Sequence, residues 1–218
     1  MTMWQFWIDR GGTFTDIVAL SSDGQTITRK FLSDNPEHYQ DATVYGVREI
    51  LGDSDAEIAC VKMGTTVGTN ALLERRGAKL AFVTNRGFKD CLFIGYQNRP
   101  DIFALNIERA QPLYETVLEL DVRVNAQGEV LQELDLKSAY HQLQLLYREG
   151  VRVLAITLMH AWRYPNHEIT LAKMARHIGF VYVALSHRVS PLPKLISRGD
   201  TTVVDAYLSP ILHRYIKQ

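Results

Sequence analysis

A glycine-rich turn near the start of the chain has the clearest potential for chemistry. Residues 9–16 read Asp-Arg-Gly-Gly-Thr-Phe-Thr-Asp. Adjacent glycines leave backbone N–H groups open to an anion because no Cβ stands in the way, and threonine hydroxyls can donate to phosphate oxygens. A carboxylate beside them can bind a hydrated Mg²⁺, which prefers carboxylate, water and phosphate oxygens. The predicted phosphate ligands are Gly11, Gly12, Thr13 and Thr15, and the predicted metal ligand is Asp9.

The elements around this turn separate it from the common phosphate-binding loops. Aromatic and apolar residues predict strands on both sides of it, over residues 5–9 and 16–20. The P-loop and the dinucleotide-binding loop are each followed by a helix, so this turn is neither of them. The alternative is a plain glycine hairpin with capping hydroxyls, which needs no ligand.

A second polar segment lies between a predicted strand and a predicted helix. Residues 64–70 read Gly-Thr-Thr-Val-Gly-Thr-Asn, after a strand over residues 59–63 and before a helix over residues 71–76. A loop in this position can direct N–H groups and hydroxyls at an anion or a polar substrate. Helix capping by a threonine is the alternative, and it is compatible with ligand binding. The predicted substrate ligands here are Thr65, Thr66, Thr69 and Asn70.

The first part of the chain predicts an α/β fold with an antiparallel start. A third strand is expected over residues 26–31. A helix is expected to begin at residues 34–37, where Asp-Asn-Pro-Glu offers a cap and a first-turn proline, and to end at Gly52. Residues 59–84 are expected to form a single crossover of strand, loop, helix and strand, with Gly77 closing the helix.

The second part predicts further crossover units. Residues 95–116 are irregular, and loops of this length are usually functional or mobile. The expected elements after them are a hairpin within residues 118–131, helices over 136–150 and 165–179, strands over 151–159 and 181–185, and a last helix over 201–216 with a break at Pro210.

Several blocks of this sequence together resemble the N-terminal domain of the ATP-dependent hydantoinase/5-oxoprolinase family. The resembling blocks are residues 9–16, 64–75, 84–90, 189–191 and 201–208. They occur in order along almost the whole chain, which is more specific than any single motif. The resemblance implies an actin/Hsp70/sugar-kinase-like (ribonuclease H-like) lobe over residues 1–188, and a connector and helix over residues 189–218 that lead toward a second lobe.

Within that family the sequence looks closest to the 5-oxoprolinases, at Arg10, residues 99–101 and Lys194. The resemblance implies that ATP, with Mg²⁺ or Mn²⁺, phosphorylates the lactam oxygen of 5-oxo-L-proline before water opens the ring to L-glutamate. Arg99 and Asp101 could bind the carboxylate and the amine of such a substrate, and an exposed salt bridge is their alternative role. Three other functions stay open: a hydantoinase, a ketone-carboxylase-type subunit, and a non-catalytic actin-like assembly module.

The overall composition argues against several other classes of protein. The 24 basic and 24 acidic residues among 218 balance, so no basic excess favours nucleic acid or an acidic membrane surface. The apolar stretch over residues 153–159 is far shorter than the roughly 20 residues of a membrane span. Two cysteines predict neither a disulfide framework nor a metal motif. These features favour a globular protein of the cytoplasm.

The resemblance also implies that the chain acts with a partner. Residues 17–218 contain no second Asp-Gly-Gly loop, and the family has its second phosphate loop in a following lobe. We therefore expect a second lobe or a partner subunit, within a homo- or hetero-oligomer, and weak nucleotide binding without activity for the chain alone. The catalytic base is not assigned, because neither His160 nor His187 stands in a recognisable Ser/His/Asp arrangement.

Overall fold

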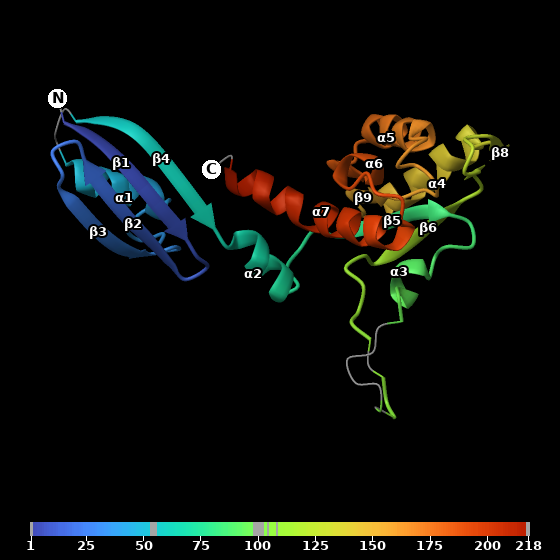
Figure 1. The fold of residues 1–218 in the computed structure, drawn as a ribbon, viewed down its shortest axis with the longest axis horizontal. Coiled ribbons are helices and arrows are strands. Elements are labelled where there is room, and N and C mark those ends of the chain that lie inside the picture. Colours follow the sequence, from blue (N-terminus) through green and yellow to red (C-terminus); the bar gives the residue numbers. More distant parts are fainter. Residues whose placement is uncertain (1, 53–55, 98–102, 104, 108, 217–218) are drawn as a thin grey trace. The chain divides into compact units, whose positions relative to one another are not determined.

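The computed structural model describes residues 2–52, 56–97, 103, 105–107 and 109–216 (Figure 1). The chain forms two compact units that divide between Arg76 and Gly77, with the chain from Arg214 grouped with the first. The division at residue 188 stays a prediction. The predicted ligands Arg99 and Asp101 lie outside the described residues. Within the described part of the chain, no helix is both long and apolar enough to cross a bilayer.

The first unit is built on a four-stranded sheet in the order β3-β2-β1-β4. The strands are β1 (Met3–Arg10), β2 (Phe14–Ser21), β3 (Thr26–Leu32) and β4 (Glu57–Thr65). The first three form the expected antiparallel meander, and β4 runs parallel to β1. Alternate residues of β1 and β2 are buried and exposed, so one face of this sheet carries the apolar core and the other carries exposed side chains, both polar (Asp9, Asp16) and apolar (Val18, Leu20).

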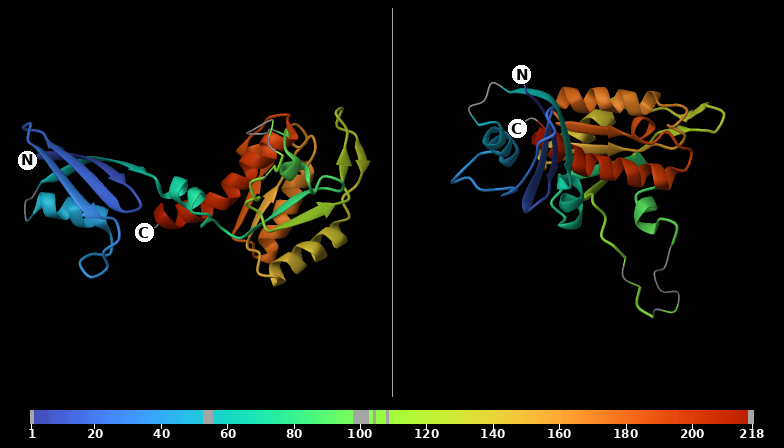
Figure 2. Two further views of the ribbon diagram at one scale, coloured as in Figure 1. Left: turned by 90° about the horizontal axis from the view of Figure 1, so that it is seen from below. Right: turned by 60° about the vertical axis from the view of Figure 1, so that its left-hand side comes forward.

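Helix α1 (Ala42–Leu51) covers the apolar face of this sheet, against Phe6, Ile17 and their neighbours (Figure 2). The prediction that this helix begins at residues 34–37 is wrong. It begins after Asp41, whose carboxylate accepts a hydrogen bond from the Val44 N–H at 2.9 Å and so satisfies an otherwise free donor. The predicted end is confirmed at Gly52, whose N–H donates to the Arg48 carbonyl at 2.8 Å.

The prediction of a single crossover over residues 59–84 is wrong. The sheet of the first unit contains β4, whereas β5 (Leu80–Asn85) belongs to a different sheet in the second unit. The helix between them, α2, spans Val67–Leu73 and not residues 71–76. Gly77 is not its cap. A Cβ at this position would lie 2.0 Å from the ring of Tyr207, so Gly77 is needed for close packing.

The second unit contains a fully parallel sheet in the order β10-β9-β5-β6. Its helices lie on both faces, as the right-hand view of Figure 2 shows for α5 and α7. The elements beside β5 are α3 (Cys91–Ile94), β6 (Thr116–Leu120), the small hairpin β7 (Arg123–Val124) and β8 (Val130–Gln132), α4 (Leu136–Arg148), β9 (Val153–Ile156), α5 (Asn166–Ile178), β10 (Tyr182–Leu185), α6 (Ser186–Val189) and α7 (Leu195–Ile216).

Most of the predicted elements of this unit are confirmed, but the last helix differs. It begins at Leu195 and continues through Pro210 without the predicted break. Proline removes one hydrogen bond from a helix interior. The turns before it are held by the buried side chains of Val203, Ala206 and Tyr207, and tertiary packing outweighs that local loss.

A buried polar network joins the helices of the second unit to the end of β9. The Glu168 carboxylate accepts hydrogen bonds from the Leu158 N–H (2.9 Å) and the Ser186 hydroxyl (2.6 Å), and it lies 2.6 Å from Nδ1 of His187. Arg198 donates to the Ser186 hydroxyl at 2.9 Å and to the Leu158 carbonyl at 2.6 Å. His187 is thus part of a structural network, and the network fixes α5, α6 and α7 together.

Arg198→Met tests how much this network stabilises the fold. Arg198 is fully buried, so its removal leaves buried oxygen acceptors unpaired and is expected to lower the free energy of unfolding by roughly 3–5 kcal/mol. Arg188→Met is the matched control, because Arg188 is exposed on α6, and its effect is expected to stay within about 0.5 kcal/mol. Urea unfolding measures both. Equal stabilities for the two variants would contradict a structural role of the network.

Candidate functional site

The predicted glycine turn joins β1 to β2 and is held from one side. Across the hairpin Asp9 lies opposite Asp16, and the Gly11 N–H donates to the Phe14 carbonyl at 2.9 Å. Ser33 binds the turn twice: its hydroxyl donates to the Gly11 carbonyl at 2.8 Å, and its N–H donates to the Thr13 carbonyl at 2.8 Å. Ser33, which directly follows β3, therefore occupies the carbonyl groups of Gly11 and Thr13.

The remaining N–H groups of the turn are available. Gly12 and Thr13 are exposed, and their N–H groups have no hydrogen-bond partner among the residues that the structure describes. Two successive free donors at the tip of a turn form an arrangement that suits an anion. Free N–H groups of this kind were predicted for Gly11, Gly12 and Thr13, but the Gly11 N–H is already used within the hairpin by the Phe14 carbonyl, so only Gly12 and Thr13 offer them. Their role as phosphate ligands stays a prediction.

The structure brings the second predicted segment next to this turn. Because β4 is parallel to β1, Asp9 lies opposite Gly64, and the Thr65 hydroxyl donates to the Arg10 carbonyl at 3.1 Å. A Cβ on Gly12 would lie 2.7 Å from Nδ2 of Asn70, so only glycine fits there without a shift of Asn70. Two segments separated by about fifty residues of sequence thus meet at one place.

The second segment is not the loop that the sequence predicted. Strand β4 continues to Thr65, and α2 already includes Thr69 and Asn70. Thr66 stands at the N-terminal boundary of α2, but its side chain makes no capping hydrogen bond. Its hydroxyl lies 3.4 Å from Nδ2 of Asn70 instead. The exposed hydroxyls of Thr66 and Thr69 therefore remain accessible to a ligand.

Thr15 has a different place from the one that the sequence suggested. It is fully buried on the face covered by α1, and its hydroxyl lies 3.0 Å from the Ser33 hydroxyl. Strand alternation places it on the side of the sheet opposite Asp9 and Asp16. The side chain of Thr15 therefore packs on the buried face of the sheet, where it contacts Ser33, and does not present a donor to solvent.

Asp9 lies in a shallow depression of about 440 Å³ on the open face of the sheet. Asp16 and Lys62 line the same depression, together with Gly64. Asp9 is exposed and has no hydrogen-bond partner among the described side chains, whereas Asp16 accepts a hydrogen bond from Lys30 at 2.8 Å. Two carboxylates on one face suit a hydrated divalent cation.

No role was predicted for Asp16 from the sequence, although it ends the predicted glycine turn. The signal was its position: Asp9 and Asp16 flank the turn symmetrically, which places both on one face of a hairpin. The described residues contain no group of three or more metal-ligating side chains. A cation here would therefore be bound largely through water and ligand oxygens.

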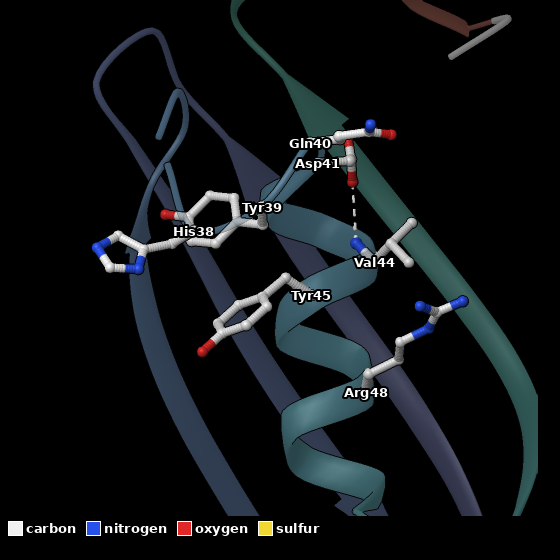
Figure 3. Close-up of a pocket in the computed structure, with 7 residues that line it drawn as sticks. All are labelled: His38, Tyr39, Gln40, Asp41, Val44, Tyr45 and Arg48. Atoms are coloured by element: carbon white, nitrogen blue, oxygen red, sulfur yellow. Dashed lines mark hydrogen bonds between the residues drawn. The ribbon is translucent and has the colours of Figure 1, made fainter. Parts of the chain in front are cut away.

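A second hollow, of about 660 Å³, lies around the start of α1 (Figure 3). Tyr39 and Tyr45 stack beside it with ring centroids 4.7 Å apart. Arg48 lies on the other side of the helix in the same view. Arg10 forms an ion pair with Asp41 at this place, so it links the glycine turn to α1. No sequence motif pointed to this hollow.

Comparison with known proteins identifies the family to which this chain is similar. The model of the hydantoinase/oxoprolinase N-terminal region matches residues 5–179. The chain is 39% identical to the 5-oxoprolinase of Dictyostelium discoideum and 37% identical to that of Saccharomyces cerevisiae, with 98% and 96% of this chain covered.

Solved structures agree with the fold. The ATP-dependent caprolactamase of Pseudomonas jessenii superposes with a TM-score of 0.82 at 28% identity, over 98% of this chain and 32% of that one. A nucleotide-free acetone carboxylase superposes with a TM-score of 0.75 at 20% identity, over 96% of this chain and 32% of that one. The latter likeness shows the fold alone.

The chain spans only about one fifth of the length of the two 5-oxoprolinases. The family match nevertheless covers the glycine turn, the segment beside it and the second unit as far as residue 179. The chain belongs to the hydantoinase/oxoprolinase family and corresponds to the N-terminal region of its members.

Proposed function

We propose that this chain is the N-terminal part of an ATP-dependent enzyme that opens a cyclic amide, and specifically a 5-oxoprolinase. The reaction would convert ATP, 5-oxo-L-proline and water into L-glutamate, ADP and phosphate. Two kinds of relative support this assignment: the 5-oxoprolinases that match at 37–39% identity, and the ATP-dependent caprolactamase of Pseudomonas jessenii, whose name denotes a lactam substrate.

The observation that carries the proposal is the pair of free N–H groups at Gly12 and Thr13. The strand that leads into the turn carries the exposed Asp9, and the side chain of Asn70 approaches Gly12. Phosphoryl transfer requires chiefly that phosphate oxygens be positioned and their charge neutralised. In this proposal the two N–H groups and the Thr13 hydroxyl bind phosphate oxygens of ATP.

The order of strands supports the proposed superfamily. An antiparallel β1-β2-β3 meander with β4 parallel to β1, and α1 on one face, is consistent with an actin-like, ribonuclease H-like lobe. In such a lobe the first hairpin would serve as a phosphate loop. The proposal therefore assigns the turn and the fold to the same role.

The residues around Asp9 fit a divalent cation. Asp9 would hold Mg²⁺ or Mn²⁺, with Asp16 on the same face; Lys62 and apolar side chains line the rest of the depression. When bound, the cation supplies positive charge to the phosphate oxygens. Asp9 is free to do this because it has no hydrogen-bond partner among the described side chains, whereas Asp16 is already paired with Lys30.

The need for ATP follows from the substrate. An amide carbon is a poor electrophile and its nitrogen is a poor leaving group, so transfer of a phosphoryl group to the lactam oxygen makes the carbon reactive toward water. The residues next to the turn would position the lactam, whose oxygen accepts the phosphoryl group. The proposed substrate ligands are Thr65, Thr66, Thr69 and Asn70, together with Arg99 and Asp101 outside the described residues. A location in the cytoplasm would be consistent with the two free cysteines, Cys60 and Cys91, because that compartment keeps thiols reduced.

Asp9→Asn tests the metal and phosphate role of the turn. In the natural protein that contains this region, we expect the rate of ADP release with saturating 5-oxo-L-proline to fall by roughly 10²–10³-fold, because the charge that holds the cation is lost. Asp23→Asn is the control, since Asp23 lies in the β2–β3 turn and bonds only locally to Ser21. Full turnover by Asp9→Asn would contradict the proposal.

The choice of substrate tests the reaction itself. ATP cleavage by the natural protein should be stimulated by 5-oxo-L-proline and by neither hydantoin nor acetone. A coupled assay for ADP measures each. Stimulation by hydantoin alone would instead identify a hydantoinase, and stimulation by acetone with bicarbonate alone would identify a ketone carboxylase.

A further inference from the structure

Strand β4 is the least covered strand of the first unit. Eight of its nine residues are exposed, and Cys60 alone is half-buried. One edge of β4 pairs with β1, and no strand among the described residues pairs with the other edge. The buried core under α1 contains residues of β1 and β2 but none of β4. Native proteins cover or blunt such an open strand, because it otherwise promotes aggregation.

The sheet register shows which side chains of β4 point toward the face of α1. Ile58 pairs with Trp4, and Val61 pairs with Phe6. Trp4 and Phe6 are buried under α1, and paired residues of neighbouring strands point to the same face of a sheet. Ile58 and Val61 therefore point to the face on which α1 lies, yet they are 48% and 49% exposed. Helix α1 thus leaves this part of the sheet open.

One flank of α1 borders the open part of the sheet. The opposite flank faces β3, because Glu49 pairs with Arg29 of that strand at 2.9 Å. Val44 and Arg48 extend from the other side of the helix, toward β4 (Figure 3). Both line the hollow of about 660 Å³ at the start of α1. The β4 surface, as we define it, comprises four residues: Val44, Arg48, Ile58 and Val61.

The β4 surface is apolar with one positive charge. Val44, Ile58 and Val61 are each close to half exposed. The guanidinium of Arg48 is exposed and has no side-chain partner among the described residues, whereas Arg10 pairs with a carboxylate. An apolar stripe beside a single unpaired cation suits an amphipathic helix that carries a carboxylate.

The last described turn of α7 lies at one end of this surface. The chain from Arg214 belongs to the first unit, and the ring centroid of Tyr215 lies 5.0 Å from Cζ of Arg10. Arg10 forms the ion pair with Asp41, which lines the same hollow as Val44. The Tyr215 hydroxyl is buried without a hydrogen-bond partner among the described residues. Buried hydroxyls are normally paired, so a polar group of another segment is expected beside it.

The relatives are long enough to supply such a segment. The two 5-oxoprolinases are about five times as long as this chain. Arg10 pairs with Thr65 at the carboxyl end of β4, and Ile58 lies seven residues before Thr65. Seven strand residues span about 23 Å, which a helix covers in about 15 residues. A helix of that length after Tyr215 therefore reaches the far end of the β4 surface.

We propose that the segment following Gln218 in the natural protein forms an amphipathic helix that packs on the β4 surface, antiparallel to β4. Its apolar side chains cover Val44, Ile58 and Val61, and a carboxylate on it pairs with Arg48. This helix lies beside α1 and completes the helical layer on that face of the sheet. The proposal does not depend on the phosphate role of the glycine turn.

The rate of thiol labelling at Val61→Cys tests whether the β4 surface is covered. The variant is made in a Cys60→Ser background, and labelling of the residue by a maleimide is followed by mass spectrometry. In the 218-residue chain the thiol should react freely, because Val61 is half exposed. In the natural protein it should react at least about 100-fold more slowly, since it becomes accessible only when the helix opens. Val44→Cys, on α1, should behave in the same way.

Val130→Cys is the matched control. Val130 is 44% exposed on β8 of the second unit, close to the 49% of Val61. Its labelling rate should differ by less than about threefold between the 218-residue chain and the natural protein, because no proposed helix covers it. Asp9→Asn should leave the labelling of Val61→Cys unchanged, so a failure of the phosphate proposal and a failure of this one give different results.

A crosslink identifies the segment that covers the surface. The photoreactive residue p-benzoylphenylalanine, placed at Val44 of the natural protein, should on irradiation form a crosslink within the first 40 residues or so after Gln218, roughly the reach of the proposed helix and its flanks. Mass spectrometry locates the crosslink, and its yield should not depend on protein concentration.

Three outcomes would overturn the proposal. Equal labelling rates of Val61→Cys in the 218-residue chain and in the natural protein would mean that the surface is open. Labelling that slows as the concentration of the 218-residue chain rises, or a crosslink between two copies, would assign the surface to a second copy. A crosslink to a remote part of the same chain would mean that a different segment covers it.

Discussion

The parallel pairing of β1 with β4 is the constraint on which the candidate site depends. It sets Asp9 opposite Gly64 and Arg10 opposite Thr65, and it therefore carries α2 to the glycine turn. A slip of the register by one residue would turn the side chains of β4 to the opposite face. The side chain of Asn70 then approaches Gly12 closely, so a Cβ at the second glycine of the turn would require Asn70 to shift.

Much of the secondary structure could be predicted from the sequence, because it depends on local features. Strands β1 to β3 follow from apolar runs and turn residues, and α5 follows from Pro165 and Gly179 at its two ends. The predicted start of α1 was wrong because the cap chosen from the sequence lay at residues 34–37, whereas Asp41 caps the helix and is also held by an ion pair with Arg10, which is distant in sequence. The membership of β4 and β5 in different sheets is a non-local property, and no local pattern reports it.

The candidate site was predictable to the extent that it depends on glycine. Two adjacent glycines pointed to the turn, and the structure leaves the N–H of Gly12 without a partner among the described residues, whereas the Gly11 N–H donates to the Phe14 carbonyl. Thr15 could not be separated from Thr13 by residue type, since both carry the same hydroxyl. Only the alternation of the strand shows that one faces solvent and the other faces α1.

The most direct test of the account is a two-dimensional amide NMR spectrum of this chain, recorded with and without MgATP at millimolar concentration. If the turn binds nucleotide phosphates, the amide resonances of Gly12 and Thr13 shift most, and Asp9→Asn abolishes the shifts. If these two resonances stay in place while others move, or if nothing moves, the turn is only a hairpin and the phosphate-binding role is contradicted.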